Sequence, residues 1–133
     1  MSSRTQQTTL SLLWLVVSLN ILIADILTLY IPESRDILAE VAGDTAIPLV
    51  MLFGAVFIQI PVLMIPACML VGCTARKWLN IIAGVITILF VVGGGSLFPH
   101  YILLAAVEVV CLIAIIAIAW RSVDTGQPAR DAG

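Results

Sequence analysis

The stretch LSLLWLVVSLNILIADILTLYI, residues 10–31, decides the fold of this 133-residue chain. A helix rises about 1.5 Å per residue and the hydrocarbon core of a bilayer is about 30 Å thick, so about 20 apolar residues cross it. The stretch therefore predicts a membrane-spanning helix. Asp25 lies inside it, and a carboxyl group is costly to place in hydrocarbon. Any interpretation of function has to account for that residue.

The composition agrees with a membrane protein. The chain is 62% hydrophobic and 11% charged, and its mean hydropathy is +1.18. Soluble domains have about half apolar and about a quarter charged residues, so we expect the lipid bilayer to surround most of this chain. The formal net charge is −2, and there is no basic cluster beyond Arg76-Lys77. We therefore expect no nucleic-acid partner.

Three more apolar runs reach membrane length, and together with the first they predict an all-α bundle of four transmembrane helices. The first run is longer than the apolar core of about 7–15 residues in a secretory signal, so we expect it to be retained. Polar residues 1–9 form a predicted N-terminal tail, and residues 121–133 a flexible cytoplasmic tail. The membrane domain is expected at 10–120, with spans at about 10–31, 47–71, 78–98 and 100–120.

The acidic segment between the first two spans predicts a short surface helix. Ser34 is expected to cap its first turn and Gly43 to end it. Pro48 then suits the first turn of the second span, because that turn needs no backbone donor.

The positive charges predict how the chain crosses the membrane. Arg35 alone lies on the side of the acidic segment, and Arg4, Arg76, Lys77, Arg121 and Arg130 lie on the other. Cytoplasmic segments carry the excess of Lys and Arg, so both termini and the 72–77 loop are predicted to be cytoplasmic. We expect a multi-pass protein of the bacterial inner (plasma) membrane.

Two segments break the regular helical pattern. Pro61 and Pro66 lie inside the second span and predict a bend, because each removes a backbone donor and crowds the preceding turn. The bend is either a candidate hinge or a kink that improves packing. At the end of the third span, Gly93, Gly94 and Gly95 leave two alternatives: a helix that continues through Phe98, or an unwound outer end.

Polar side chains in three spans are predicted to lie at similar depth. Asp25 is about 7–8 Å outward of the midplane and Glu108 about 3 Å, at 1.5 Å per residue, while Gln59 is near the middle of its span. Positions seven apart share a helix face, which groups Ser18 with Asp25 and Tyr101 with Glu108. We predict that Asp25, Glu108, Gln59, Tyr101 and Ser18 form an intramembrane polar site.

The chemistry of this predicted site leaves two interpretations open. No lysine or arginine is predicted at that depth, so two ionised carboxylates would repel each other. We expect at least one of Asp25 and Glu108 to be protonated at neutral pH and to share its proton, for which a cation could substitute. Alternatively, these groups are structural, because hydrogen bonds also hold membrane helices together.

No catalytic or cofactor-binding pattern is found. The sequence contains no Ser/His/Asp set, metal-ligand cluster or nucleotide-binding loop at usable spacing, so no catalytic residue, metal or cofactor is predicted and the protein is not expected to be an enzyme. The odd number of cysteines, Cys68, Cys73 and Cys111, favours small apolar packing residues over disulfides. Asn80 is predicted to reach interfacial water at the cytoplasmic end.

Three motifs carry a resemblance to a known group. LNILIAD in the first span, RKWLNIIAG at the start of the third and VEVV in the fourth resemble a family of small bacterial four-helix integral membrane proteins of unknown function. The resemblance covers 10–120 and implies a four-helix membrane fold without an assigned activity. In size and helix count alone the chain is also similar to DoxX-like proteins.

Two classes of function follow. The first is a small proton- or cation-linked transporter or channel-like protein that uses Asp25 and Glu108. The second is a non-catalytic structural or accessory subunit of a membrane complex. Either class is compatible with a homo-oligomer or with membership of a larger membrane complex.

Overall fold

The computed structural model describes residues 3–94 and 97–121, and these residues form helices only. Four of the helices are long and apolar enough to cross a membrane. The prediction of an all-α, four-span membrane protein is confirmed. The helices are α1 (Ser3–Leu29), α2 (Ser34–Ala42), α3 (Ile47–Leu70), α4 (Cys73–Gly93) and α5 (Pro99–Arg121).

Two helices begin earlier than the apolar runs that predicted them. The N-terminal tail predicted at 1–9 is helical from Ser3 onward, and Thr8 and Thr9 hydroxyls donate to carbonyls one turn back. α4 begins at Cys73 rather than at 78, because Gly72 is extended and no residue after it breaks a helix. Hydropathy marks the membrane-embedded part of a helix, and the helix itself continues through compatible polar residues.

The glycines after α4 decide one of the open alternatives. The helix ends at Gly93, and the backbone N–H of Gly94 donates to Phe90 O in a terminal turn. A helix that continues through Phe98 is therefore excluded, whereas Gly95 lies outside the described residues. The predicted flexible tail after Arg121 also lies outside them.

The predicted surface helix is present as α2, and the prediction is confirmed for the residue that ends it but not for the residue that caps its start. Gly43 has a φ of 53° and ends α2, as predicted from the tolerance of glycine for this conformation. The prediction that Ser34 caps the helix is wrong, because Glu33 occupies the cap position and no side chain caps the helix. Pro48 lies in the first turn of α3, as predicted.

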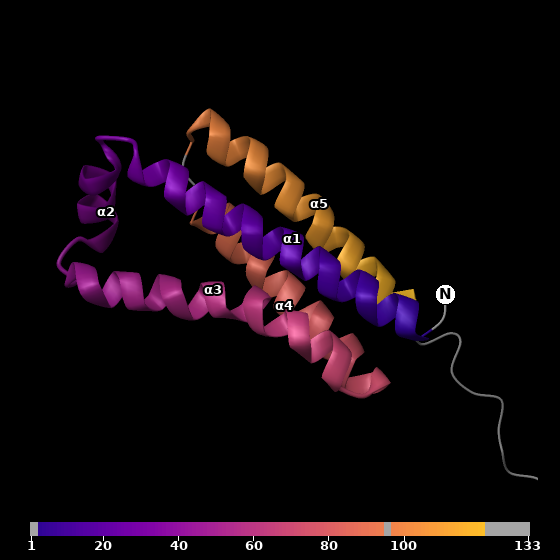
Figure 1. The fold of residues 1–133 in the computed structure, drawn as a ribbon. Helices are drawn as coiled ribbons and strands as arrows, with labels where there is room; N and C mark the ends of the chain where they lie inside the picture. Colours follow the sequence, from indigo (N-terminus) through magenta and orange to yellow (C-terminus); the bar gives the residue numbers. More distant parts are fainter. Residues whose placement is uncertain (1–2, 95–96, 122–133) are drawn as a thin grey trace, which may run out of the picture.

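The four long helices form an antiparallel bundle in which α1 packs against α3 and α5, and α4 packs against the same two helices (Figure 1). Only Val71 and Gly72 separate α3 from α4, so these helices form a tight hairpin. The start of α1 and the end of α5 lie at one end of the bundle, here called the tail end (Figure 1). The opposite end, next to α2, is called the α2 end.

The packed core occupies the half of the bundle near the tail end. Gly84 allows α4 to approach α5 closely there, since a Cβ at this position would lie 3.0 Å from Cγ1 of Ile116. Mutual burial of large side chains then fixes the rotation of each helix. Fully buried apolar residues of this core include Leu10, Trp14, Val17, Cys68, Leu112 and Ile115.

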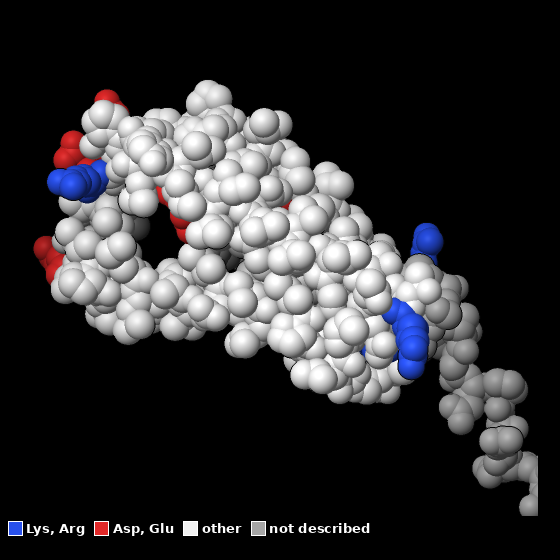
Figure 2. Space-filling view, in the orientation of Figure 1, with Lys and Arg blue, Asp and Glu red and all other residues white. Residues whose placement is uncertain are grey.

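α3 changes direction midway, and its first half leans away from α1 toward the α2 end (Figure 1). Pro61 and Pro66 lie inside this helix, and interior prolines are a known cause of such bends. The buried residues of α3 are Pro61, Met64 and Cys68, all in its second half. Figure 2 shows the result as an opening between α1, α2 and α3, with acidic atoms at its edge.

Charged side chains gather at the two ends of the molecule and leave an apolar belt between them (Figure 2). Acidic groups and one basic group surround the α2 end, and basic groups mark the tail end (Figure 2). Large side chains of the belt are widely exposed, among them Leu12, Leu63, Leu89 and Leu103. This surface suits hydrocarbon as solvent, and together with the four long helices it indicates a multi-pass membrane protein.

Candidate intramembrane carboxyl site

Three of the predicted polar residues line one small cavity. Asp25 comes from α1, and Tyr101 and Glu108 come from α5; the cavity has a volume of about 30 Å³. α4 supplies part of the wall through Phe90 and Val91. The cavity lies between α1, α4 and α5, toward the α2 end of the bundle.

The sequence places these side chains together through two helical repeats. Tyr101 and Glu108 are seven residues apart on α5, which is almost two turns, so they lie on one face. Ile21 and Ala24 of α1 are buried and line the cavity, and Asp25 follows them on the edge of the same face. Glu108 is only 3% exposed, whereas Asp25 is exposed.

Tyr101 is held in position by the end of α4. Its hydroxyl donates a hydrogen bond of 3.1 Å to Val91 O. Carbonyls in the last turn of a helix lack the usual intrahelical partner, and α4 ends at Gly93. Tyr101 therefore satisfies one of these carbonyls, and its oxygen remains able to accept a hydrogen bond within the cavity.

The two carboxyl groups have no hydrogen-bond donor within the part of the chain that the structure describes. Among residues 3–94 and 97–121, no hydrogen bond reaches the side chain of Asp25 or Glu108, and no lysine or arginine lines their cavity. A buried carboxylate without a partner is costly. The remaining ways to satisfy the pair are a proton on one carboxyl, water, or a bound cation. A cavity of about 30 Å³ accommodates roughly two water molecules, because each needs about 10–15 Å³ of this kind of volume.

Asp25 and Glu108 differ in their access to the surroundings. Asp25 is exposed on α1, the helix that borders the opening between α1, α2 and α3 (Figure 2). Glu108 is almost completely buried. The geometry thus gives an accessible carboxyl and an inner one along the same cavity.

Two residues of the predicted site do not belong to this group. Gln59 is exposed on α3 and does not line the cavity. Ser18 donates to Trp14 O of its own helix and also lies away from the cavity. Of the five predicted residues, the cavity brings together Asp25, Tyr101 and Glu108. The physical reason is that similar depth does not fix the direction in which a helix turns its side chain.

A second polar cluster, not predicted from the sequence, lies in the tail half of the bundle. Trp14 Nε1 donates to Asn80 Oδ1 at 2.7 Å, and the Cys68 thiol donates to the same oxygen at 3.3 Å. Asn80 Nδ2 donates to Arg76 O at 2.7 Å. Asn80 is completely buried, so the prediction that it reaches interfacial water is wrong. A buried tryptophan needs a hydrogen-bond acceptor for its N–H. The presence of Trp14 within an apolar span was therefore the one feature of the sequence that indicated a buried polar partner.

Arg76 extends this cluster to the end of α3. Its side chain is 3% exposed and donates to Cys68 O at 3.5 Å and to Cys73 Sγ at 3.3 Å. A cation near the last carbonyls of a helix interacts favourably with the helix dipole, so Arg76 stabilises the α3–α4 hairpin. Cys68 is buried and Cys73 exposed, so the packing role predicted for the cysteines does not extend to Cys73.

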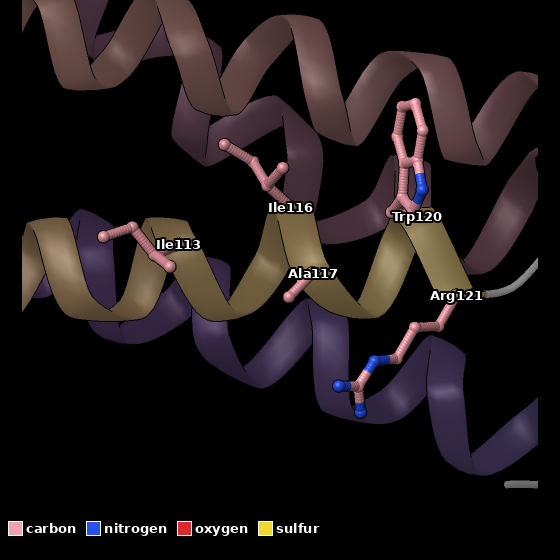
Figure 3. A pocket seen from close by; sticks show the side chains of 5 residues that line it. All are labelled: Ile113, Ile116, Ala117, Trp120 and Arg121. Atoms are coloured by element: carbon pink, nitrogen blue, oxygen red, sulfur yellow. The ribbon is translucent and has the colours of Figure 1, made fainter.

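Another concavity, of about 350 Å³, lies on the outer surface of α5 near the tail end and contains no carboxyl group. Trp120 and Arg121 point to opposite sides of the helix there, and the small side chain of Ala117 lies one turn before them (Figure 3). Lys77 Nζ lies 4.6 Å from the centre of the Trp120 ring. Aromatic and basic side chains of this kind are typical of the membrane–water interface.

Comparison with known proteins places the chain in a family. No curated protein and no solved structure matches it significantly. A family model described as "Family of unknown function (DUF6326)" matches residues 2–126, which covers the four spans and all three cavity side chains. The four-helix family of unknown function expected from the sequence motifs is thereby shown: the chain belongs to the DUF6326 family.

Proposed function

We propose that this protein is a small proton- or cation-linked transporter or channel-like protein, with Asp25 and Glu108 as its ion-binding carboxyls. The observation that carries the proposal is the shared cavity, which brings two carboxyl groups and the Tyr101 hydroxyl together with no lysine or arginine among the residues that line it. Ionisable groups within a membrane span rarely face lipid, and they commonly mark ion pathways and proton relays.

The size of the cavity narrows the ligand class. About 30 Å³ is the size of a site for a proton carried by a carboxyl, for water, or for one small cation. Two neighbouring carboxylates repel strongly in a low-dielectric surrounding. A shared proton or a bound cation removes this repulsion, and oxygen ligands suit hard cations. Tyr101 orients the ligand from its fixed position against Val91 O.

The packing on either side of the cavity favours gated movement over an open pore. The bundle is open between α1, α2 and α3 at the α2 end (Figure 2), and Asp25 on α1 is exposed. Toward the tail end, Trp14, Leu112 and Ile115 are fully buried and close the bundle. An ion that passes Glu108 therefore needs a change in helix packing, which is the behaviour of a transporter.

The proposal is tested by flux measurements on the purified protein in liposomes. With a pH gradient across the membrane, followed by an internal pH-sensitive dye, Asp25→Asn and Glu108→Gln are each expected to reduce protein-dependent flux at least about tenfold, comparable to the loss of a group that acts directly in proton transfer. The matched controls Asp36→Asn and Glu40→Gln remove exposed carboxyls of α2 and should leave flux unchanged. Replacing the proton gradient by a sodium or potassium gradient distinguishes the two ligand classes.

Infrared difference spectroscopy gives an independent reading of the same site. The wild-type protein is expected to show the carbonyl band of a protonated carboxylic acid at neutral pH, which shifts or disappears in Asp25→Asn or Glu108→Gln. If the band is absent and no ion gradient drives flux in the wild type, the proposal fails.

The buried cluster around Asn80 supports a second candidate, a structural or accessory subunit of a membrane complex. Polar contacts between helices stabilise membrane bundles, and the carboxyls would then do the same. This alternative predicts that Asp25→Asn and Glu108→Gln lower the melting temperature, and that the wild-type protein conducts no ion.

A further inference from the structure

Gln59 is a polar side chain that the four-helix bundle leaves unused. It lies near the middle of α3 (Ile47–Leu70), it is exposed, and among the described residues its amide makes no hydrogen bond. Cys68, on the buried face of α3, follows nine residues later. At about 100° per residue this spacing is half a turn around the helix, so Gln59 points directly away from the bundle.

Hydrocarbon cannot satisfy such a group. Lipid chains offer neither donors nor acceptors, so an amide at the centre of a span is costly unless another polar group meets it. Polar side chains within spans accordingly face protein or a water-filled cavity. The carboxyl cavity does not serve this purpose, because α1, α4 and α5 line it and α3 does not.

The residues around Gln59 have the spacing of a helix–helix seam. Leu52, Val56 and Leu63 share its outward face at intervals of four, three and four residues, and they are 59%, 57% and 62% exposed. This spacing is that of the two core positions of a heptad repeat. A single polar residue in such a seam fixes register and oligomeric state.

We propose that α3 forms the contact of a homodimer in which the Gln59 amides of two copies pair across the symmetry axis. Two copies inserted in the same orientation have parallel α3 helices, so residue 59 of one meets residue 59 of the other at the same depth. A primary amide carries both a donor and an acceptor, and two identical amides complete each other in an isologous contact. The seam defined by Leu52, Val56, Gln59 and Leu63 packs around the pair.

This interface leaves the candidate ion site of each copy intact. The residues that line the cavity with Asp25 and Glu108 come from α1, α4 and α5, and none comes from α3. The dimer is therefore independent of the proposed function, and its test does not depend on ion flux.

The test measures dimerisation in liposomes by single-molecule photobleaching of a fluorophore at the C-terminus, over a range of protein-to-lipid ratios. The wild type is expected to bleach mainly in two steps. Gln59→Leu should raise the dimer dissociation constant about tenfold, in line with the effect of single polar residues in model membrane helices. The melting temperature of the monomer should stay unchanged, because among the described residues Gln59 makes no hydrogen bond that the change would break.

Two double variants test whether dimerisation depends on an amide within the seam or on an amide anywhere on the lipid-facing surface. Gln59→Leu with Leu52→Gln moves the amide by seven residues along the same face and should restore dimerisation. Gln59→Leu with Leu103→Gln places it on α5, where Leu103 is 67% exposed, and should not. A monomeric wild type, an unchanged dissociation constant in Gln59→Leu, or equal rescue by both double variants would overturn the proposal.

Discussion

Single residues decide how this bundle satisfies its polar groups, and two asparagines show the contrast. The Asn80 amide meets Trp14, Cys68 and Arg76 O in the packed core. Asn20 Nδ2 is buried without a partner among the described residues. A buried polar group contributes to stability only when it is paired, since otherwise the cost of removing it from water is not offset.

Replacing Asn80 by leucine is therefore expected to destabilise the protein. Asn80→Leu leaves Trp14 Nε1 and the Cys68 thiol without their acceptor, at a cost of about 1–3 kcal/mol. Unfolding by SDS titration in mixed micelles, followed by circular dichroism, measures the change in free energy of unfolding.

Asn20→Leu is the matched control. It removes an amide whose nitrogen, Asn20 Nδ2, is buried without a partner among the described residues. The free energy of unfolding should therefore be unchanged or increased. Equal destabilisation by the two substitutions would contradict the assignment of Asn80 as the organising residue of the core.

At the scale of an element, the bend of α3 shapes the opening between α1, α2 and α3 (Figure 2). Its second half packs into the core through Met64 and Cys68, and its first half diverges from α1 (Figure 1). Pro61 lies between the two halves and lacks the N–H that would bond to Phe57 O. The divergence leaves the opening between α1, α2 and α3 (Figure 2).

Pro61→Ala is expected to straighten α3 and narrow that opening. The alanine restores a backbone donor and removes the ring that crowds the preceding turn. Spin labels at Ile26 and Met51, both exposed, in a variant whose native cysteines are replaced by alanine, report the separation of α1 and α3 by double electron–electron resonance. The distance distribution should shift to shorter values.

Pro48→Ala serves as the control for this prediction. Pro48 lies in the first turn of α3, where a backbone donor is not required, so the distance should not change. An unchanged distance in Pro61→Ala would show that packing rather than the proline sets the bend, and the hinge prediction would be wrong.

At the scale of the whole molecule, the distribution of charge predicts the orientation in the membrane. Basic groups mark the tail end and acidic groups the α2 end (Figure 2), so the tail end is predicted to be cytoplasmic. The native cysteines offer a direct test, because Cys73 at the tail end is exposed whereas Cys68 is buried and Cys111 half-buried.

A membrane-impermeant maleimide should label Cys73 in inverted membrane vesicles and not in intact cells. The opposite pattern is expected for Glu40→Cys combined with Cys73→Ser, since Glu40 lies in α2 at the other end of the bundle. Labelling of Cys73 from outside intact cells would reverse the predicted topology.

Much of the fold was accessible from local sequence properties. The four spans follow from the length and hydropathy of continuous runs, and a rise of about 1.5 Å per residue places a side chain along its helix. Tyr101 and Glu108 share a face because both belong to one helix. Helix ends were harder to predict from the sequence. Ser3 and Cys73 begin helices in polar sequence, where hydropathy does not indicate the start of a helix.

The candidate site was accessible only in part. Asp25, Gln59 and Glu108 have similar predicted depth, yet the structure turns Gln59 away and joins the other two with Tyr101. The contact between Trp14 and Asn80 joins residues 66 positions apart, and no local pattern predicts a pairing at that separation.

The sequence by itself determined that this is a four-span membrane protein with carboxyl groups inside the bilayer, because hydropathy and helical rise are local properties. Only the tertiary structure decided which polar groups meet. The rotation of each helix depends on how all four helices pack their large and small side chains against one another. That packing brings Asp25 to Glu108, buries Asn80 against Trp14 and leaves Gln59 facing outward.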